Sequence, residues 1–303
     1  YGPEFEIIQG DQSKFYILLG SILLLGAGAT ILQVAGNPIM RDVSAEGKYS
    51  SNLSFAQAIK AIGSSLGFIL PPLVATWMGW NFSVLFPIYS GLIVINILWI
   101  NSVKIKERKA IDSKPASIGS CLSLLGNGYV LMIVLAIFLY VGAEVSMSSG
   151  VPMLLKDAFQ IEEVGLWIAW ALFFLPIFVG RLFGSLILRA IKPRAFLLIT
   201  VIVSIIGILM MFTKVQMITF AGVILVGLGF ANIFPLIFSM AIDKMPERTN
   251  ELSGLMVTAI VGGAFIPPLM GVVADNSSIL IGFFIPLICI IYITFVATFA
   301  GKK

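Results

Sequence analysis

The chain has 303 residues, of which 59% are hydrophobic and 11% charged, and its mean hydropathy is +1.04. A soluble domain carries about 25% charged residues, so this composition excludes a soluble enzyme, a nucleic-acid-binding protein and a secreted disulfide scaffold. The sequence has no histidine and two cysteines, Cys121 and Cys289, in separate apolar stretches. We therefore expect no cofactor, no metal site and no histidine-based catalysis.

Nine apolar runs follow one another along the chain, each long enough to cross a hydrocarbon layer of about 30 Å as a helix. They cover residues 15–38, 51–78, 81–101, 129–153, 164–188, 195–213, 216–242, 252–274 and 278–300. The runs are too long and too continuously apolar for barrel strands, and only helices or closed barrels satisfy the backbone in lipid. The sequence therefore predicts an all-α polytopic membrane protein and not an enzyme.

The basic residues between these runs are distributed unequally over the two sides of the membrane. If the C-terminus is cytoplasmic, Lys14, Lys156 and Lys214 lie outside, and Lys60 and Arg181 lie within spans. The other fourteen are then cytoplasmic: Arg41, Lys48, Lys104, Lys106, Arg108, Lys109, Lys114, Arg189, Lys192, Arg194, Lys244, Arg248, Lys302 and Lys303. By the positive-inside rule, this predicts a multi-pass protein of the cell inner membrane with a cytoplasmic C-terminus.

Two sequence pairs indicate an internal repeat. LLLGAG at 23–28 matches ILVGLG at 224–229, and FILPPL at 68–73 matches FIPPL at 265–269. The first two spans then correspond to the seventh and eighth. The sequence therefore predicts a twelve-helix protein made of two six-helix halves. Nine of these helices are expected in this sequence, and the first three are expected to be absent from it. Residues 1–101 would complete the N-terminal bundle, 102–128 would form a cytoplasmic linker, and 129–303 would form the C-terminal bundle.

Ionisable side chains within spans cost about 2.5–3.5 kcal/mol on insertion scales, and they often mark functional sites. Glu144 is the only carboxylate well inside a span, with small neighbours such as Gly142 and Ser146. It belongs either to a central cleft or to a structural ion pair. Lys60 shares a helical face with Gln57, and it either faces the same cleft or extends to the membrane surface.

The amides and prolines within spans allow binding or structural roles. Gln33 and Asn37 are four residues apart, and an amide can both donate to and accept from a sugar hydroxyl; the alternative is an interhelical hydrogen bond. Asn37, beside Pro38, could instead cap or gate its helix. Asn232, three residues before Pro235, could line the cleft or support a kink. Arg181 could counter Glu144, but an inner-gate role is favoured. The expected substrate-binding residues are Gln33, Asn37, Gln57, Lys60, Glu144 and Asn232, and the expected gating or structural residues are Arg181, Pro38 and Pro235.

Several segments are similar to one transporter family. They read ILQVAGNP at 31–38, NLSFAQAIKAIGSSLG at 52–67, YVGAEVS at 140–146, GRLFG at 180–184, NIFPLIFSMAI at 232–242 and SGLMVTAIVGGAFIPPLMG at 253–271. The chain thereby resembles the L-fucose:proton symporter and glucose/galactose transporter family of the major facilitator superfamily. The resemblance implies a monomer in the lipid bilayer that takes up a monosaccharide by alternating access, driven by a coupling cation, a proton or sodium.

Two positions depart from the pattern of that family. The fucose symporter has an acidic residue where this chain has Gln33, and an asparagine is usual where it has Lys60. The lysine would suit an acidic sugar or an amino-sugar derivative, or it could pair with an acidic residue in helices that precede this sequence. A second alternative is an efflux antiporter for drugs or metabolites. An amide is found in the fucose relatives at the position of Glu144, which favours a sugar-binding role for this residue over a proton-carrying one.

Overall fold

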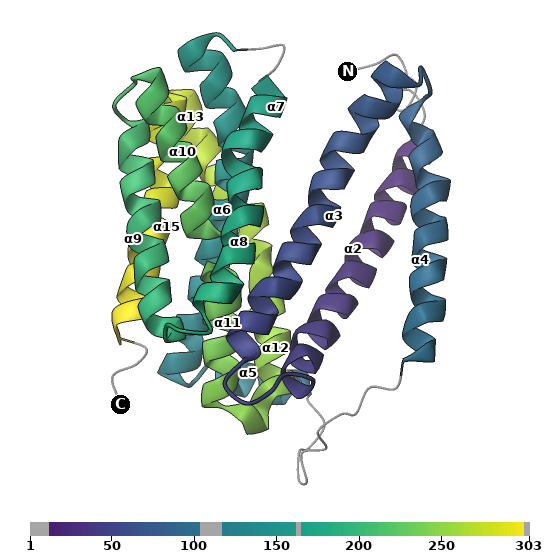
Figure 1. Cartoon of the computed structure of the whole chain (residues 1–303), viewed down its shortest axis with the longest axis vertical. Coiled ribbons are helices and arrows are strands. Elements are labelled where there is room, and N and C mark those ends of the chain that lie inside the picture. The colour runs from purple at the N-terminus through teal and green to yellow at the C-terminus, as the bar shows by residue number, and fades with distance from the viewer. Residues whose placement is uncertain (1–11, 104–116, 162–164, 300–303) are drawn as a thin grey trace.

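The computed structural model describes residues 12–103, 117–161 and 165–299, and Figure 1 shows the arrangement of their helices. Within these residues nine helical stretches are long and apolar enough to cross a membrane: Ser13–Asp42, Tyr49–Trp77, Leu85–Ser102, Gly128–Phe159, Trp167–Ile187, Pro193–Met211, Gln216–Lys244, Pro246–Asn276 and Ile279–Phe299. Each overlaps one predicted span. The described residues contain no strand, so the prediction of an all-α polytopic fold is confirmed.

Three long helices form one group: α2 (Gln12–Asp42), α3 (Tyr49–Trp77) and α4 (Leu85–Ser102), the last preceded by the short turn η1 (Phe82–Val84). Their apolar side chains are largely exposed; Leu23, Leu24 and Leu25 on α2 are each at least 70% exposed. Such surfaces are tolerated in lipid, where an apolar side chain has no water to avoid.

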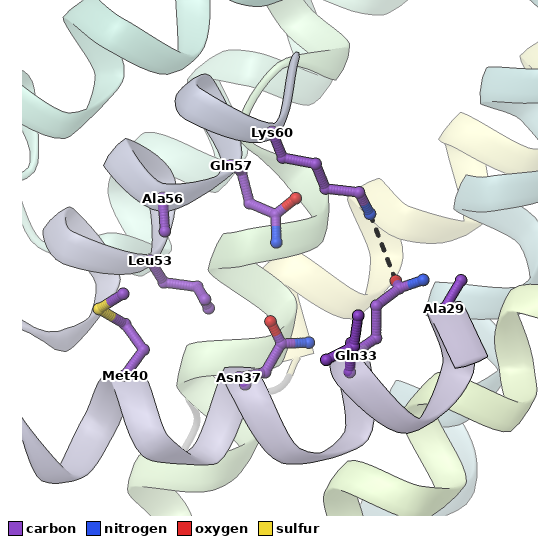
Figure 2. A pocket seen from close by; sticks show the side chains of 10 residues that line it. Ala29, Gln33, Asn37, Met40, Leu53, Ala56, Gln57 and Lys60 are labelled. Carbon is purple, nitrogen blue, oxygen red and sulfur yellow. Dashed lines mark hydrogen bonds between the residues drawn. The ribbon is translucent and has the colours of Figure 1, made fainter. Parts of the chain in front are cut away.

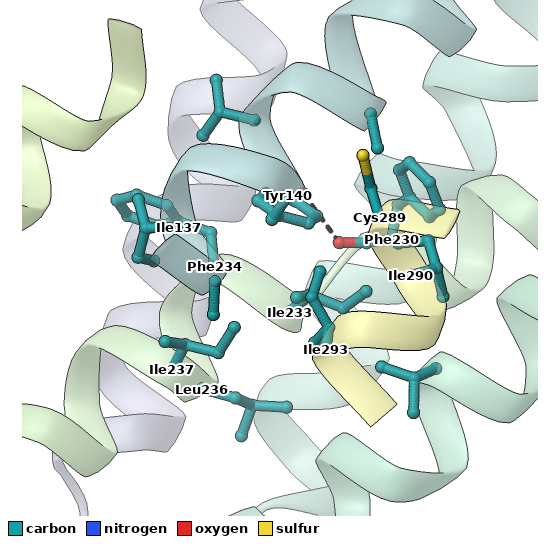
Figure 3. Packing of buried hydrophobic residues seen from close by; sticks show 14 of the residues in the cluster. Ile137, Tyr140, Phe230, Ile233, Phe234, Leu236, Ile237, Cys289, Ile290 and Ile293 are labelled. Carbon is teal, nitrogen blue, oxygen red and sulfur yellow. Dashed lines mark hydrogen bonds between the residues drawn. The ribbon is translucent and has the colours of Figure 1, made fainter. Parts of the chain in front are cut away.

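The remaining elements form a second, closely packed group. In chain order they are α5 (Ile118–Leu124), α6 (Gly128–Phe159), α7 (Gly165–Ala169), the π-helical segment η2 (Trp170–Phe174), α8 (Leu175–Ile187), α9 (Pro193–Met211), α10 (Gln216–Phe230), α11 (Ile233–Lys244), η3 (Pro246–Arg248), α12 (Thr249–Thr258), η4 (Ala259–Val261), α13 (Gly262–Asn276), α14 (Ile279–Gly282) and α15 (Phe284–Phe299). Figure 3 shows its core, where α6, α10, α11 and α15 meet. There the fully buried Tyr140 donates a hydrogen bond to the Phe230 carbonyl at 2.9 Å.

Glycines set the closest helix contacts in this second group. A Cβ added to Gly207 on α9 would lie 2.6 Å from the Gly222 carbonyl oxygen on α10, and a Cβ on Gly222 would lie 2.6 Å from the Gly207 oxygen. Small residues at helix interfaces let two backbones approach within van der Waals distance. The α9–α10 contact therefore requires glycine on both helices.

Replacing Gly207 with valine should lower the melting temperature of the detergent-purified protein measurably, because overpacking a close contact costs about 1–3 kcal/mol. The control is Gly91→Ala on α4, where an added Cβ meets nothing within 4 Å. We expect the control to melt at or above the wild-type temperature, since alanine favours a helix over glycine. Equal melting of the Gly207 variant and the wild type would contradict this role of the α9–α10 contact.

Several helices begin or end at other residues than the predicted apolar runs. The first helix does not end at Pro38 but continues to Asp42, since loss of one backbone N–H does not break a helix supported by neighbours. The predicted linker at 102–128 contains α5, which begins with a capping box between Ser117 and Ser120. Residues 104–116 and 300–303, with their predicted cytoplasmic basic residues, lie outside the described part, as do residues 162–164 in the fifth span.

Candidate functional site

A cavity of about 390 Å³ lies between α2 and α3, and it brings together four of the predicted site residues (Figure 2). Gln33 and Asn37 come from α2, one helical turn apart, and Gln57 and Lys60 come from α3 with a similar spacing. The Lys60 ammonium donates a hydrogen bond to Gln33 Oε1 at 3.3 Å. The lining residues are Ala29, Leu32, Gln33, Gly36, Asn37, Met40, Leu53, Ala56, Gln57 and Lys60.

Asn37 lines this cavity, and its amide nitrogen has no hydrogen-bond acceptor among the described residues. The side chain is 7% exposed, and its Nδ2 is buried without a hydrogen-bond partner among the described residues. The Asn37 backbone carbonyl accepts from the Tyr49 hydroxyl at 3.0 Å, which fixes α2 against the start of α3. A buried donor without an acceptor costs about 1–3 kcal/mol.

Next to the cavity, an ion pair joins α8 to α6. Arg181 Nη2 lies 3.2 Å from Glu144 Oε1, and both side chains are largely covered. Arg181 also donates to the backbone carbonyl of Gln57 at 3.4 Å and to that of Ala231 at 3.0 Å. The guanidinium thus links Glu144 to the helix that carries Gln57 and Lys60. Two roles were considered for Arg181. The structure shows its ion pair with Glu144, and its role at an inner gate stays a prediction.

Asn232 is not brought to this cavity. It is 1% exposed at the junction of α10 and α11, and its Nδ2 donates to the Gly180 carbonyl at 2.7 Å. Gly184, one turn further along α8, leaves the space that the Asn232 side chain occupies. The buried Pro235 follows in the first turn of α11, and Pro38 is half-buried within α2. These contacts favour the structural role for Asn232, which is to stabilise the break between α10 and α11.

Hydrogen bonds near one end of the molecule join the two groups of helices, and the sequence did not indicate them. Ser50 Oγ lies 2.7 Å from Ser239 Oγ, and Ser51 Oγ donates to the Ser185 carbonyl at 2.6 Å. Ser253 Oγ donates to the Val34 carbonyl at 2.9 Å. We call these three interactions the serine contact. A lone serine in a span is common, so only the fold reveals which ones meet.

A salt bridge between Arg41 and Asp243, at 3.6 Å, joins α2 to α11. Toward the opposite end, at the top of Figure 1, α3 and α7 diverge. A second, mostly apolar cavity of about 230 Å³ lies between the middle of α3 and the η2–α8 region, with Trp170 in its wall. Among the described residues, the polar bonds between the two groups of helices therefore include the serine contact and the Arg41–Asp243 salt bridge at one end, and the Arg181–Gln57 hydrogen bond further along α3.

The fold and the embedded polar groups define a helical membrane transporter, and comparison with known proteins assigns its family. The family model described as "Major Facilitator Superfamily" matches residues 7–268. The chain belongs to the major facilitator superfamily, whose members are transporters and not enzymes.

Two relatives place it more narrowly. The chain is 30% identical over 304 residues to a glucose/galactose transporter of Brucella abortus, covering 95% of this chain and 73% of the relative. It is 24% identical to the L-fucose-proton symporter of Escherichia coli, covering 100% of this chain and 75% of the relative. The crystal structure of FucP, a major facilitator transporter, in the outward conformation matches with a TM-score of 0.80 at 21% identity, over 95% of this chain and 77% of that one. The family resemblance predicted from the sequence is confirmed.

Proposed function

We propose that the protein takes up a monosaccharide of the fucose, glucose or galactose type across the cell inner membrane by cation symport, with the proton as coupling ion. The cavity between α2 and α3 carries this proposal. Three amides and one ammonium line it, and amides can donate to and accept from hydroxyl groups. Its volume of about 390 Å³ lies at the lower end of the usual range for small-molecule sites, which suits a monosaccharide. The names of the relatives support a sugar as the substrate.

The way the two groups of helices meet supports alternating access. The serine contact closes one end, while α3 diverges from α7 at the other end (Figure 1). The closed end carries Arg41, Lys244 and Arg248, so the positive-inside rule makes it cytoplasmic. In this proposal the structure is an outward-open state of a monomer with a cytoplasmic C-terminus, and the serine contact breaks when the site opens inward.

Counterflow in proteoliposomes containing the full-length protein tests the transport proposal. Vesicles are preloaded with unlabelled D-glucose, D-galactose, L-fucose or a hexuronate, and uptake of the same labelled sugar is followed. A transporter produces transient accumulation that protein-free vesicles do not show. Counterflow with none of these sugars would contradict monosaccharide transport.

The variant Gln33→Ala should weaken the apparent affinity for the transported sugar about three- to tenfold, because one neutral hydrogen bond contributes about 0.5–1.5 kcal/mol. The matched control is Gln216→Ala, which removes the exposed amide at the start of α10, away from the cavity. Concentration dependence of counterflow measures both. Equal affinities for the two variants would argue against Gln33 as a binding residue.

A further inference from the structure

Charge balance in the membrane-embedded polar cluster points to the kind of sugar. Glu144 and Arg181 neutralise each other at 3.2 Å. Among the described residues Lys60 is the single charged residue that lines the cavity, and it donates a hydrogen bond to the neutral Gln33 amide. The described cluster of Lys60, Arg181 and Glu144 therefore carries a net charge of +1. A cation held within the membrane is costly unless an anion or a water-filled space compensates it.

The geometry around Lys60 leaves room for an anionic partner. An ammonium has three donors, and the contact with Gln33 Oε1 uses one of them at 3.3 Å. Charge-assisted bonds from nitrogen to a carboxylate oxygen are shorter, at about 2.7–2.9 Å. Figure 2 shows the Lys60 side chain extending from α3 toward α2 on the cavity side, where the Gln57 and Asn37 amides also lie.

We propose that the substrate is a monosaccharide with one carboxylate, of the hexuronate class, whose carboxylate binds the Lys60 ammonium while its hydroxyls bind the cavity amides. This inference rests on the proposed function and names the substrate class of the same site. Asn37 also lines the cavity, so its amide adds a neutral polar group to the same wall. The cavity thus offers a point charge and neutral donors to an acceptor-rich ligand.

A monoanion fits the cavity better than a sugar phosphate. Phosphate near neutral pH carries more than one negative charge and is commonly bound by arginine forks or several cations. Here the nearby Arg181 is already engaged by Glu144 and by two backbone carbonyls. One lysine supplies one compensating charge, which matches one carboxylate.

Equilibrium binding to the purified full-length protein in detergent tests this inference. The probes are D-glucuronate and D-galacturonate, the neutral hexoses D-glucose and D-galactose, and glucose 6-phosphate. We expect a hexuronate to bind at least about tenfold more tightly than its neutral hexose, since hydrogen bonds to charged groups are worth about 1.5–3 kcal/mol. The comparison uses the wild type, so it does not depend on a variant that folds.

The variant Lys60→Gln should reduce this preference to less than about threefold, mainly by weakening hexuronate binding, while Lys60→Arg should keep it. Lys214→Gln removes an exposed lysine between α9 and α10 and is the matched control, with an unchanged preference. Elution as a monodisperse peak shows that each variant is folded.

Three outcomes would overturn the inference. Neutral hexoses that bind as tightly as hexuronates would show that Lys60 is compensated elsewhere, and sugar transport would stand without this substrate class. Tighter binding of glucose 6-phosphate than of the hexuronates would show that the site prefers a dianionic sugar phosphate. If no monosaccharide binds and counterflow is also absent, the proposed function fails, and the substrate class fails with it.

Discussion

A disulfide between cysteines placed at Ser50 and Ser239 should stop transport. The two Oγ atoms are 2.7 Å apart and belong to α3 and α11, so the side chains are close enough for a bridge after small adjustments. If the serine contact must open for inward release, a covalent bond across it holds the protein in one state. Oxidation of the double-cysteine protein should therefore reduce counterflow to the background level, and a reductant should restore it.

The background for this experiment replaces Cys121 and Cys289, which are free thiols, with alanine. Each single-cysteine variant is a control and should keep its counterflow under oxidation. Substrate binding to the oxidised double variant should persist, which distinguishes a locked transporter from a damaged one. Full counterflow after complete cross-linking would contradict the role assigned to this contact.

The variant Glu144→Gln should lower gradient-driven accumulation and sugar exchange together, each about tenfold or more, since a charged hydrogen bond is worth about 1.5–3 kcal/mol. Arg181 Nη2 lies 3.2 Å from Glu144 Oε1, so this variant weakens the ion pair between α6 and α8. In the proposed role Glu144 holds Arg181 in place and accepts its hydrogen bond, and it does not carry the coupling proton.

Exchange across equilibrated membranes needs no coupling, so comparing it with accumulation separates the two roles of Glu144. Normal exchange with lost accumulation would identify Glu144 as the proton carrier instead. The matched control is Glu247→Gln, an exposed carboxylate in η3, which should leave both activities unchanged.

The number and positions of the membrane helices could be predicted from the sequence, because hydrocarbon thickness fixes the length of an apolar span. Finer features had no comparable signal. Residues 170–174 form a π-helical segment, although their composition resembles that of the helices around them. The short α5 begins at a serine capping box, and a search for long apolar runs does not detect such a helix.

The site could be predicted only in part. The spacing of Gln33 with Asn37 and of Gln57 with Lys60 indicated shared faces, and the structure places these faces on one cavity. Asn232 has the same chemistry as Asn37, but it packs against α8, since Gly184 leaves space for its side chain and the Gly180 carbonyl accepts its hydrogen bond. Sequence alone cannot choose between such partners, because the choice depends on which helices are neighbours.

Accumulation of the sugar against its own concentration gradient tests the proposed symport most directly. Proteoliposomes containing the full-length protein receive an inward proton gradient, an inward sodium gradient or no gradient, with labelled hexose or hexuronate outside. We expect the proton gradient to raise the internal sugar concentration above the external one, and a protonophore to abolish the difference. Accumulation with the sodium gradient alone would show that sodium, and not the proton, is the coupling ion. Uptake that stops at equal concentrations under every gradient would contradict symport.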